Sequence, residues 1–321
     1  MPSTDEILVA DIGGTNARFA IAQRVDDTYS LSEIRRYEVA KHNSAIDVAK
    51  EYLQLSSFSP GCACFAVAGP IIDGEVTFTN SKWHLNAENV RKTLKLERFE
   101  LVNDFVALAE GIKFLTDQDF LEIKAGIVEK GKPTLVIGPG TGLGQAIILG
   151  SEVIATEGGH VRFAPVGERQ KKLVAALEVS NPDIMVERLL SGNGLVEVYR
   201  SLSSSPLHSG EAITLAAEEG HDQAAMDSLD LFFEILGQVV GDAVLSTGAR
   251  GGVILAGGIL PNITKLLLAS KFTDRFCGKG TMRSYMEPIP IRLIIRDHAA
   301  LFGAADRLDR QARSPALRGQ I

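Results

Sequence analysis

The feature that most constrains this chain is the clustering of its glycines. Many of the 31 glycines among its 321 residues lie in four short groups, at Gly13-Gly14, Gly138 to Gly144, Gly158-Gly159 and Gly251 to Gly258. A glycine inside a helix or strand costs about 0.5–1 kcal/mol relative to alanine. Clusters of glycine therefore indicate turns at which the backbone comes close to a ligand.

The first two glycine groups each join two strand-like runs. Ile7 to Ala10 is apolar and leads through Asp11 to the Gly13-Gly14 turn, after which apolar residues alternate along the chain. The apolar run 135–137 leads in the same way to Gly138 to Gly144, and the chain returns over 145–149. Two hairpins of one design suggest the duplication of one structural unit.

Helical and strand patterns alternate along the rest of the chain. The spacing of apolar residues predicts core strands at 62–68, 99–102 and 253–256, and helices at 44–55, 86–94, 105–112, 182–190, 211–219, 229–245 and 262–269. Such alternation favours an α/β layered fold. With 45% apolar residues over this length, we expect two domains with separate hydrophobic cores.

Charge and cysteine content exclude several classes of partner. The formal net charge is -7, from 33 basic and 40 acidic residues, which disfavours nucleic acid and anionic lipid surfaces. The three cysteines show no paired spacing, so neither a disulfide framework nor a zinc site is expected and the cytoplasm is predicted. The uncharged stretch 133–151 contains five glycines and two prolines, which favours strand, turn and strand over a membrane helix.

Both glycine turns suit the binding of phosphate. Neither ends in the Gly-Lys-Ser/Thr of a P-loop, so backbone amides, hydroxyls and Mg²⁺ would hold the phosphates. Asp11 could hold that Mg²⁺ through water. Either turn alone could equally be the tip of an ordinary hairpin that needs glycine for a positive φ, whereas the two turns together favour phosphate.

Six separated motifs carry a family resemblance. In order and spacing they resemble bacterial glucokinases from Val9 to about Gly303, and they are Asp11 to Arg18, Asn103 to Phe105, Gly138 to Gly144, Glu157 to His160, Glu187 to Leu195 and Leu255 to Ile259. The family's zinc-binding cysteine cluster is absent here, which indicates the zinc-free branch. Asn193 departs from the family pattern, where proline is usual, and so does His298, which stands in a segment where an Asn-x-Gly pattern is common.

The resemblance implies a fold and an activity. The fold would be the actin-like, ribonuclease H-like arrangement of two lobes with ATP and sugar in a cleft between them. The smaller lobe would comprise residues 1–110 and 302–321, and the larger lobe residues 111–301. The activity would be transfer of a phosphoryl group from MgATP to the 6-hydroxyl of D-glucose, giving glucose 6-phosphate and ADP in the first step of glycolysis. A homodimer would be the form of the protein.

The resemblance also assigns roles to residues. Asp104 matches the catalytic base, and Asp11 would be the Mg²⁺ ligand. The expected sugar ligands are Asn103, Asp104, Glu157, His160 and Glu187. The expected ATP-binding residues are Ala10, Asp11, Ile12, Gly13, Gly14, Thr15, Gly138, Gly140, Thr141, Gly142, Gly257 and Gly258.

Each assigned residue also has an ordinary structural interpretation. Asp104 follows a strand and precedes a helix, where an aspartate commonly serves as the N-cap. Glu157 and His160 could belong to a solvated surface turn, and Glu187 could be an exposed acid beside Arg188. Trp83 is expected in the core, and the other histidines show no metal-ligand spacing.

Two other functions remain open from the sequence. The chain could phosphorylate another hexose, such as mannose, fructose or an N-acylhexosamine. It could also be an actin-like ATPase switch, which would share the two glycine turns but would need neither Asp104 nor the sugar ligands.

Overall fold

The computed structural model describes residues 3–78, 82–203 and 207–313. The chain divides into two compact units, which we call unit 1, residues 1–118 and 296–321, and unit 2, residues 119–295. The lobe boundaries expected near residues 110 and 302 stay a prediction.

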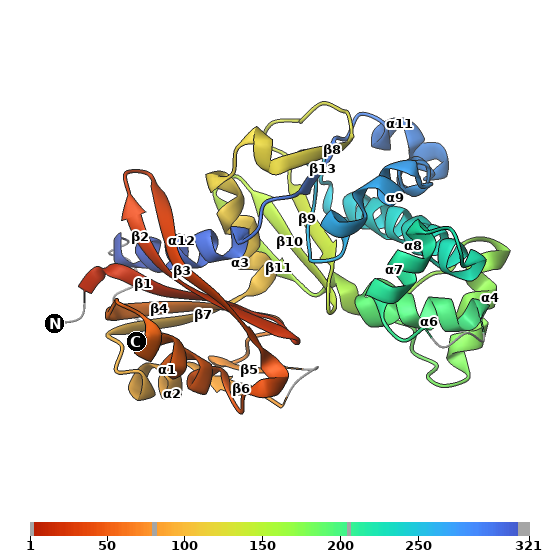
Figure 1. Ribbon diagram of the computed structural model, residues 1–321. Helices are drawn as coiled ribbons and strands as arrows, with labels where there is room; N and C mark the ends of the chain where they lie inside the picture. The colour runs from red at the N-terminus through yellow and green to blue at the C-terminus, as the bar shows by residue number, and fades with distance from the viewer. Residues whose placement is uncertain (1–2, 79–81, 204–206, 314–321) are drawn as a thin grey trace. The chain divides into compact units, whose positions relative to one another are not determined.

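Unit 1 is built on a five-stranded sheet with the strand order β3-β2-β1-β4-β7 (Figure 1). The strands β1 (Ser3–Ile12) and β2 (Asn16–Val25) form the antiparallel hairpin that the alternating pattern predicts, and β3 (Thr28–Glu38), which the sequence analysis did not predict, runs antiparallel to β2. The strands β4 (Pro60–Val67) and β7 (Arg98–Asn103) continue the sheet parallel to β1. Every residue of β4 is buried, as expected for an apolar strand covered on both faces.

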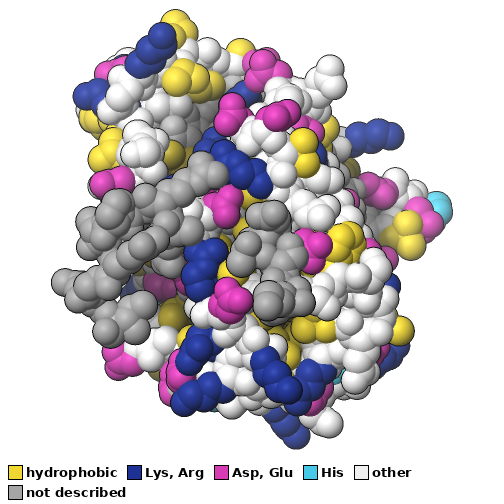
Figure 2. All heavy atoms as spheres, turned by 90° about the vertical axis from the view of Figure 1, so that its left-hand side faces the viewer, with side chains coloured by type: hydrophobic (Ala, Val, Ile, Leu, Met, Phe, Trp, Pro, Cys, Tyr) yellow, Lys and Arg dark blue, Asp and Glu magenta, His cyan; other side chains and the backbone are white. Residues whose placement is uncertain are grey.

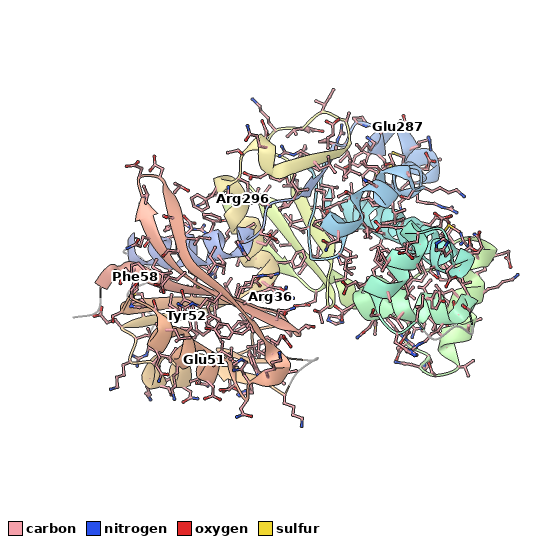
Figure 3. The ribbon with its side chains drawn as sticks, viewed as in Figure 1. Arg36, Glu51, Tyr52, Phe58, Glu287 and Arg296 are labelled. Carbon is pink, nitrogen blue, oxygen red and sulfur yellow. The ribbon has the colours of Figure 1, made fainter. Side chains whose placement is uncertain are left out.

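Helices cover both faces of this sheet. On one side lie α1 (Ala45–Leu55) and α2 (Ala87–Thr93), and on the other α3 (Asp104–Gly111) and α12 (Ala299–Arg313) (Figure 1). The ring of Tyr52, labelled on α1 in Figure 3, lies 5.7 Å from the ring of Phe19 on β2. Trp83 is 3% exposed and joins the same core, which confirms the core position expected for it. A short hairpin of β5 (Glu75–Thr77) and β6 (His84–Asn86) completes the unit.

Unit 2 repeats the strand order of unit 1. Its sheet has the order β11-β10-β9-β12-β13-β8, in which β9 (Thr134–Pro139), β10 (Leu143–Leu149) and β11 (Glu152–Thr156) run antiparallel. The strands β12 (Gly252–Leu255) and β13 (Ile291–Ile294) follow in parallel, and β8 (Phe120–Lys124) adds an antiparallel edge. Both sheets thus begin with a three-stranded meander and continue in parallel, which supports the suggested duplication.

The helices of unit 2 centre on α8 (Gln223–Thr247), which spans the region where a long core helix was expected. Against it pack α6 (Gly192–Leu202), α7 (Gly210–Glu218) and α10 (Phe272–Cys277). The other helices are α4 (Gly167–Glu178), α5 (Val186–Leu189), α9 (Thr264–Ala269) and α11 (Arg283–Met286). The expected loop at 201–209 lies partly outside the described residues.

Two expected helices of unit 2 are shorter than the sequence pattern suggests. Of the helix predicted over 182–190, only α5 is helical. Residues 182–185 are not helical, and Met185 instead forms a β-bridge with Arg162. The helix predicted from residue 262 begins at Thr264, after a 3₁₀ turn over Leu260–Ile263 that contains Pro261. Proline fits a first helical turn but cannot donate a backbone hydrogen bond within it.

Acidic and basic side chains lie intermixed on the face of the molecule shown in Figure 2. Among the described residues, the helices are all too short or too polar to cross a lipid bilayer.

Candidate active site

The first glycine turn closes the β1–β2 hairpin of unit 1. The N–H of Gly13 donates to the carbonyl oxygen of Asn16 at 2.9 Å. Gly13 does not have a positive φ, and a Cβ added there would lie 3.6 Å from the same oxygen, at an ordinary contact distance. Neither backbone strain nor crowding explains Gly13, so this position leaves room for a ligand, while its N–H is engaged in closing the hairpin.

Asp11 stands beside this turn and is paired with Arg18. The two residues face each other across the β1–β2 hairpin, and Arg18 Nη1 lies 3.3 Å from Asp11 Oδ2. Burial raises the pKa of Asp11, and the neighbouring Arg18 offsets part of that rise. The Asp11 side chain is nonetheless 24% exposed, so a hydrated cation can reach it.

Asn103 and Asp104 lie at the same edge of the sheet as the first turn. The strands β1, β4 and β7 are parallel, and Ile12, Val67 and Asn103 stand in register at their carboxyl ends. With neighbouring strands about 4.8 Å apart, Asn103 is roughly 10 Å from Ile12. The carboxyl edge of parallel strands is where open α/β sheets bind ligands.

The N-cap of α3 is Asn103, not Asp104. The Asn103 Oδ1 accepts from the N–H groups of Phe105 at 3.0 Å and Val106 at 3.2 Å. Asp104 is the first helical residue, and its Oδ1 also accepts from Phe105 N–H, at 2.9 Å. The ordinary capping role considered for Asp104 therefore belongs to its neighbour. The carboxylate of Asp104 stands at the helix N-terminus, where the helix dipole stabilises negative charge.

The second glycine turn joins β9 to β10 in unit 2 and lies beside the turn after β12. Gly140 and Gly258 do not have a positive φ. A Cβ at Gly140 would meet nothing nearer than Gly258 N, at 3.9 Å, and a Cβ at Gly258 would meet nothing within 4 Å. Both positions leave room for a ligand to approach the backbone, although the Gly140 N–H already donates to the carbonyl oxygen of Gly142 at 2.7 Å.

Three predicted sugar ligands are brought together around Leu143, at the start of β10. Glu187 Oε2 accepts from Leu143 N–H at 2.8 Å, and Gly159 packs so closely on Leu143 that an added Cβ would lie 2.4 Å from its carbonyl oxygen. Glu157 and His160 flank this contact, with His160 Nε2 3.8 Å from Glu157 Oε2 and both side chains about half exposed. Two carboxylates and an imidazole offer the mixture of acceptors and donors that sugar hydroxyls need.

Arg188 is not the partner of Glu187. The Nε of Arg188 donates to Glu197 Oε2 at 2.8 Å instead. The interpretation of Glu187 as an exposed acid beside Arg188 is therefore wrong, because Glu187 is partly buried and binds the backbone of Leu143.

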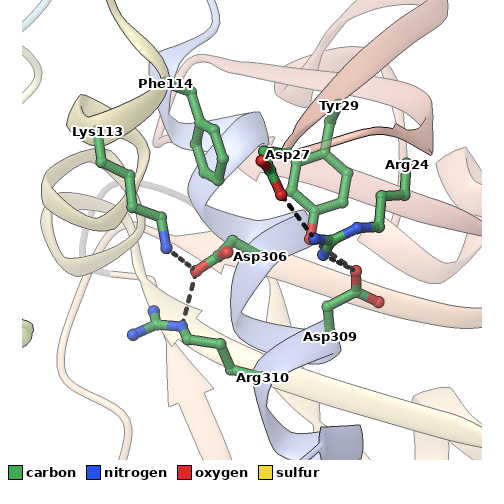
Figure 4. A pocket seen from close by; sticks show the side chains of 8 residues that line it. All are labelled: Arg24, Asp27, Tyr29, Lys113, Phe114, Asp306, Asp309 and Arg310. Carbon is green, nitrogen blue, oxygen red and sulfur yellow. Dashed lines mark hydrogen bonds and ion pairs between the residues drawn. The ribbon is translucent and has the colours of Figure 1, made fainter.

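A pocket of about 310 Å³ in unit 1 is lined by none of the predicted site residues (Figure 4). Its acids are already paired, Asp306 with Lys113 and Arg310, and Asp309 with Arg24 and Tyr29. Arg24 and Tyr29 stand on β2 and β3 towards the hairpin end that is opposite the first glycine turn. The pocket is thus not the candidate active site.

The described residues suit Mg²⁺ only when the ion is also bound by phosphate. Among the described residues, no group of three or more histidine, cysteine, aspartate or glutamate side chains is placed to hold a metal ion. Mg²⁺ commonly keeps several waters and binds through one or two carboxylates together with substrate phosphates. The single carboxylate of Asp11 beside an open glycine turn suits that mode.

Sequence reasoning missed two neighbours of Asp11. The sequence analysis gave Arg18 no role, although a hairpin centred on residues 14 and 15 pairs it with Asp11, so the register of the hairpin carried the signal. His298 contributes to the electrostatic environment of Asp11 from the residue before α12. The distance along the chain left no sequence signal for this second interaction.

Comparisons with known proteins place the chain in a family. The model of the family "Glucokinase" matches residues 8–311. The glucokinase of Chromohalobacter salexigens is 36% identical over 315 residues, covering 95% of this chain and 98% of the relative. The glucokinase of Caulobacter vibrioides is 37% identical over 319 residues, covering 96% of each chain. The chain belongs to the glucokinase family.

Solved structures agree with this assignment. The crystal structure of a glucokinase from an Antarctic psychrotroph is 33% identical, with a TM-score of 0.81, and covers 96% of this chain and 100% of that chain. The glucokinase of Balamuthia mandrillaris in complex with glucose has a TM-score of 0.80 at 21% identity, over 95% and 94% of the two chains, which supports the fold alone. The family, the actin-like α/β fold class and the enzyme class of ATP-dependent hexose kinase, all expected from the sequence, are confirmed.

Proposed function

We propose that this member of the glucokinase family transfers the γ-phosphoryl group of MgATP to the 6-hydroxyl of D-glucose, giving glucose 6-phosphate and ADP in the first step of glycolysis. One observation carries the proposal: Glu157, His160 and Glu187 are held around Leu143, directly at the end of the glycine turn suited to phosphate. Carboxylates and an imidazole beside a turn suited to phosphate fit a ligand that carries several hydroxyls and accepts a phosphoryl group.

The nucleotide would be held mainly by backbone groups. The segment Ala10 to Thr15 and the residues Gly138, Gly140, Thr141 and Gly142 would bind the phosphates, with Gly257 and Gly258 beside the adenosine. The open positions at Gly13, Gly140 and Gly258 support their part of this assignment, because neither strain nor packing explains these three glycines. Close packing explains Gly138, and a φ of 87° together with close packing explains Gly257. Asp11 would hold Mg²⁺ through water, and the ion would neutralise charge on the phosphates.

Asp104 would act as the catalytic base. It would orient the sugar's 6-hydroxyl and accept its proton as the O6–P bond forms and the bond between the γ-phosphorus and the bridging oxygen of ADP breaks. A carboxylate is a weak base, so the proton moves late, when the hydroxyl oxygen already meets a metaphosphate-like phosphoryl group. Asn103, Glu157, His160 and Glu187 would fix the sugar by hydrogen bonds to its other hydroxyls.

The test is turnover with separate assays for ADP and for sugar 6-phosphate. Wild-type protein and Asp104→Asn would be given MgATP with glucose, mannose, fructose or N-acetylglucosamine. We expect glucose to be preferred, and kcat of Asp104→Asn to fall by about 10²–10⁴-fold with little change in glucose binding. The amide keeps the shape of the side chain and removes the proton acceptor.

Other outcomes would point to the remaining candidates. Preference for mannose, fructose or N-acetylglucosamine would assign a different hexose to the same site. Release of ADP at an unchanged rate without sugar would indicate an ATPase switch, and the roles of Glu157, His160 and Glu187 as sugar ligands would then be wrong. The homodimer and the cytoplasmic location implied by the sequence stay proposals, and light scattering of the purified protein tests the first of them.

A further inference from the structure

Glu187 touches the second glycine turn directly. Its Oε2 accepts from the backbone N–H of Leu143 at 2.8 Å, although the two residues are 44 positions apart in the chain. Glu187 is partly buried on the four-residue helix α5. One oxygen of an expected sugar ligand is therefore already engaged with the backbone at the end of the turn expected to bind phosphate.

Gly142 makes room for this carboxylate. A Cβ at position 142 would lie 2.2 Å from Glu187 Oε2 and 2.8 Å from its carboxyl carbon, so the carboxylate would have to move. Gly142 does not have a positive φ, and backbone conformation does not explain it. This glycine differs from Gly140, whose Cβ position is open.

A second contact joins the same turn to α6. The N–H of Gly192, the first residue of α6, donates to the carbonyl oxygen of Gly140 at 2.9 Å. α5 packs against α6 and against the 3₁₀ turn that ends in His160. The glycine turn, α5 and the segment of Glu157 and His160 therefore form one packed cluster inside unit 2.

We propose that Glu187 is a positioning residue for the nucleotide as well as a sugar ligand. Its Oε2 fixes the phosphate-binding turn through Leu143 N–H, and Oε1 accepts from a sugar hydroxyl. This inference rests on the proposed function. A bound sugar restrains the carboxylate that holds the turn, so sugar and nucleotide each raise the affinity of the protein for the other.

Nucleotide binding without sugar tests the positioning role. MgADP would be titrated calorimetrically into wild type, Glu187→Ala and Glu187→Gln. We expect the Kd of Glu187→Ala for MgADP to rise by about tenfold, as for the loss of one hydrogen bond to a charged group. Glu187→Gln should stay within about twofold of wild type, because its amide oxygen can still accept from Leu143 N–H, while its glucose KM rises by about tenfold or more.

Glu197→Gln is the matched control. It makes the same chemical change to the acid on α6 that pairs with Arg188, outside the expected site, and should change neither MgADP affinity nor glucose KM. Circular dichroism and thermal unfolding check that each variant is folded. If Glu187→Ala binds MgADP as wild type does, or if the alanine and glutamine variants lose the same affinity, the positioning role is overturned.

A double-mutant cycle gives an independent test. Gly142→Ala should weaken MgADP binding by pushing the Glu187 carboxylate away from Leu143 N–H. In the Glu187→Ala background the same change should then cost much less, because the displaced group is absent. Full additivity of the two effects would contradict the proposal. Failure of the proposed function would appear elsewhere, as absent glucose phosphorylation by wild-type protein, since the titrations need no turnover.

Discussion

At the scale of the residue, His298 departs from the family pattern and has both an unusual backbone conformation and a partly buried side chain. It has a φ of 72°, it is partly buried beside Asp11 and Arg18, and its Nδ1 is buried without a hydrogen-bond partner. Burial lowers the pKa of His298 below its ordinary value of 6.5. The folded state therefore binds fewer protons than the unfolded state as the pH falls through 6.5, and stability is lost in that direction.

We expect His298→Asn to reduce this acid sensitivity. Asparagine does not titrate and tolerates a positive φ. Wild type should lose more thermal stability between pH 7.5 and pH 5 than the variant does, which melting curves at both values would show. The matched control is His221→Asn, at an exposed position of unit 2, which should leave the pH dependence of wild type unchanged. An equal loss in wild type and in His298→Asn would contradict the prediction.

At the scale of the element, α3 and α12 pack through a pair of glycines. A Cβ at Gly303 of α12 would lie 1.7 Å from the carbonyl oxygen of Ala107, and one at Gly111 would lie 2.0 Å from that of Ala299. The two backbones therefore touch. Arg307 strengthens the contact by bridging Glu100 of β7 and Glu110 of α3, at 2.5 and 2.9 Å. These contacts fix the helix that begins with Asp104.

We expect Gly303→Ala to lower the free energy of unfolding by about 1–3 kcal/mol, as overpacking of a close contact does. The control is Gly192→Ala at the start of α6, where the nearest atom to an added Cβ is 3.7 Å away and where alanine should be neutral or stabilising. Urea unfolding measures both. A Gly303→Ala protein as stable as wild type would mean that the helices do not pack as closely as described.

At the scale of the whole molecule, unit 1 is assembled from both ends of the chain. α12 contacts β1, β4 and α3, and buries Leu301, Phe302 and Leu308 in that unit. Unit 2 is one continuous segment with its own hydrophobic core, which extends from β9 to α8 and β13. The two units therefore depend differently on the C-terminal segment.

We expect a chain that ends at Ile295 to lose order in unit 1 and to keep it in unit 2. Hydrogen exchange followed by mass spectrometry should show protection lost over residues 3–118 and retained over 119–295, because only the first unit loses a covering helix. Simultaneous loss of protection in both units would show that they unfold as one cooperative system, and uniform retention would show that α12 is dispensable.

Much of the fold could be predicted because its signals are local. The apolar run that became β4, the alternation in β2 and the helical spacing in α8 follow from residues close together in the chain. The pattern was misleading over 182–190, where a β-bridge between Arg162 and Met185 overrides the helical spacing. A long-range contact of that kind leaves no periodic signal.

By itself the sequence determined the fold class, the two glycine turns and the family, since motif order and hydrophobic period are properties of the chain alone. Only the tertiary structure decided how the candidate residues are used. The pairing of Asp11 with Arg18 depends on the register of the hairpin. The capping of α3 by Asn103 depends on the direction of its side chain. The hydrogen bond from Leu143 N–H to Glu187 joins residues that are 44 positions apart in the chain. A hydrogen bond forms only when donor and acceptor lie at the right distance and angle. The order of residues in the chain does not show these distances and angles, because they are set when the chain packs.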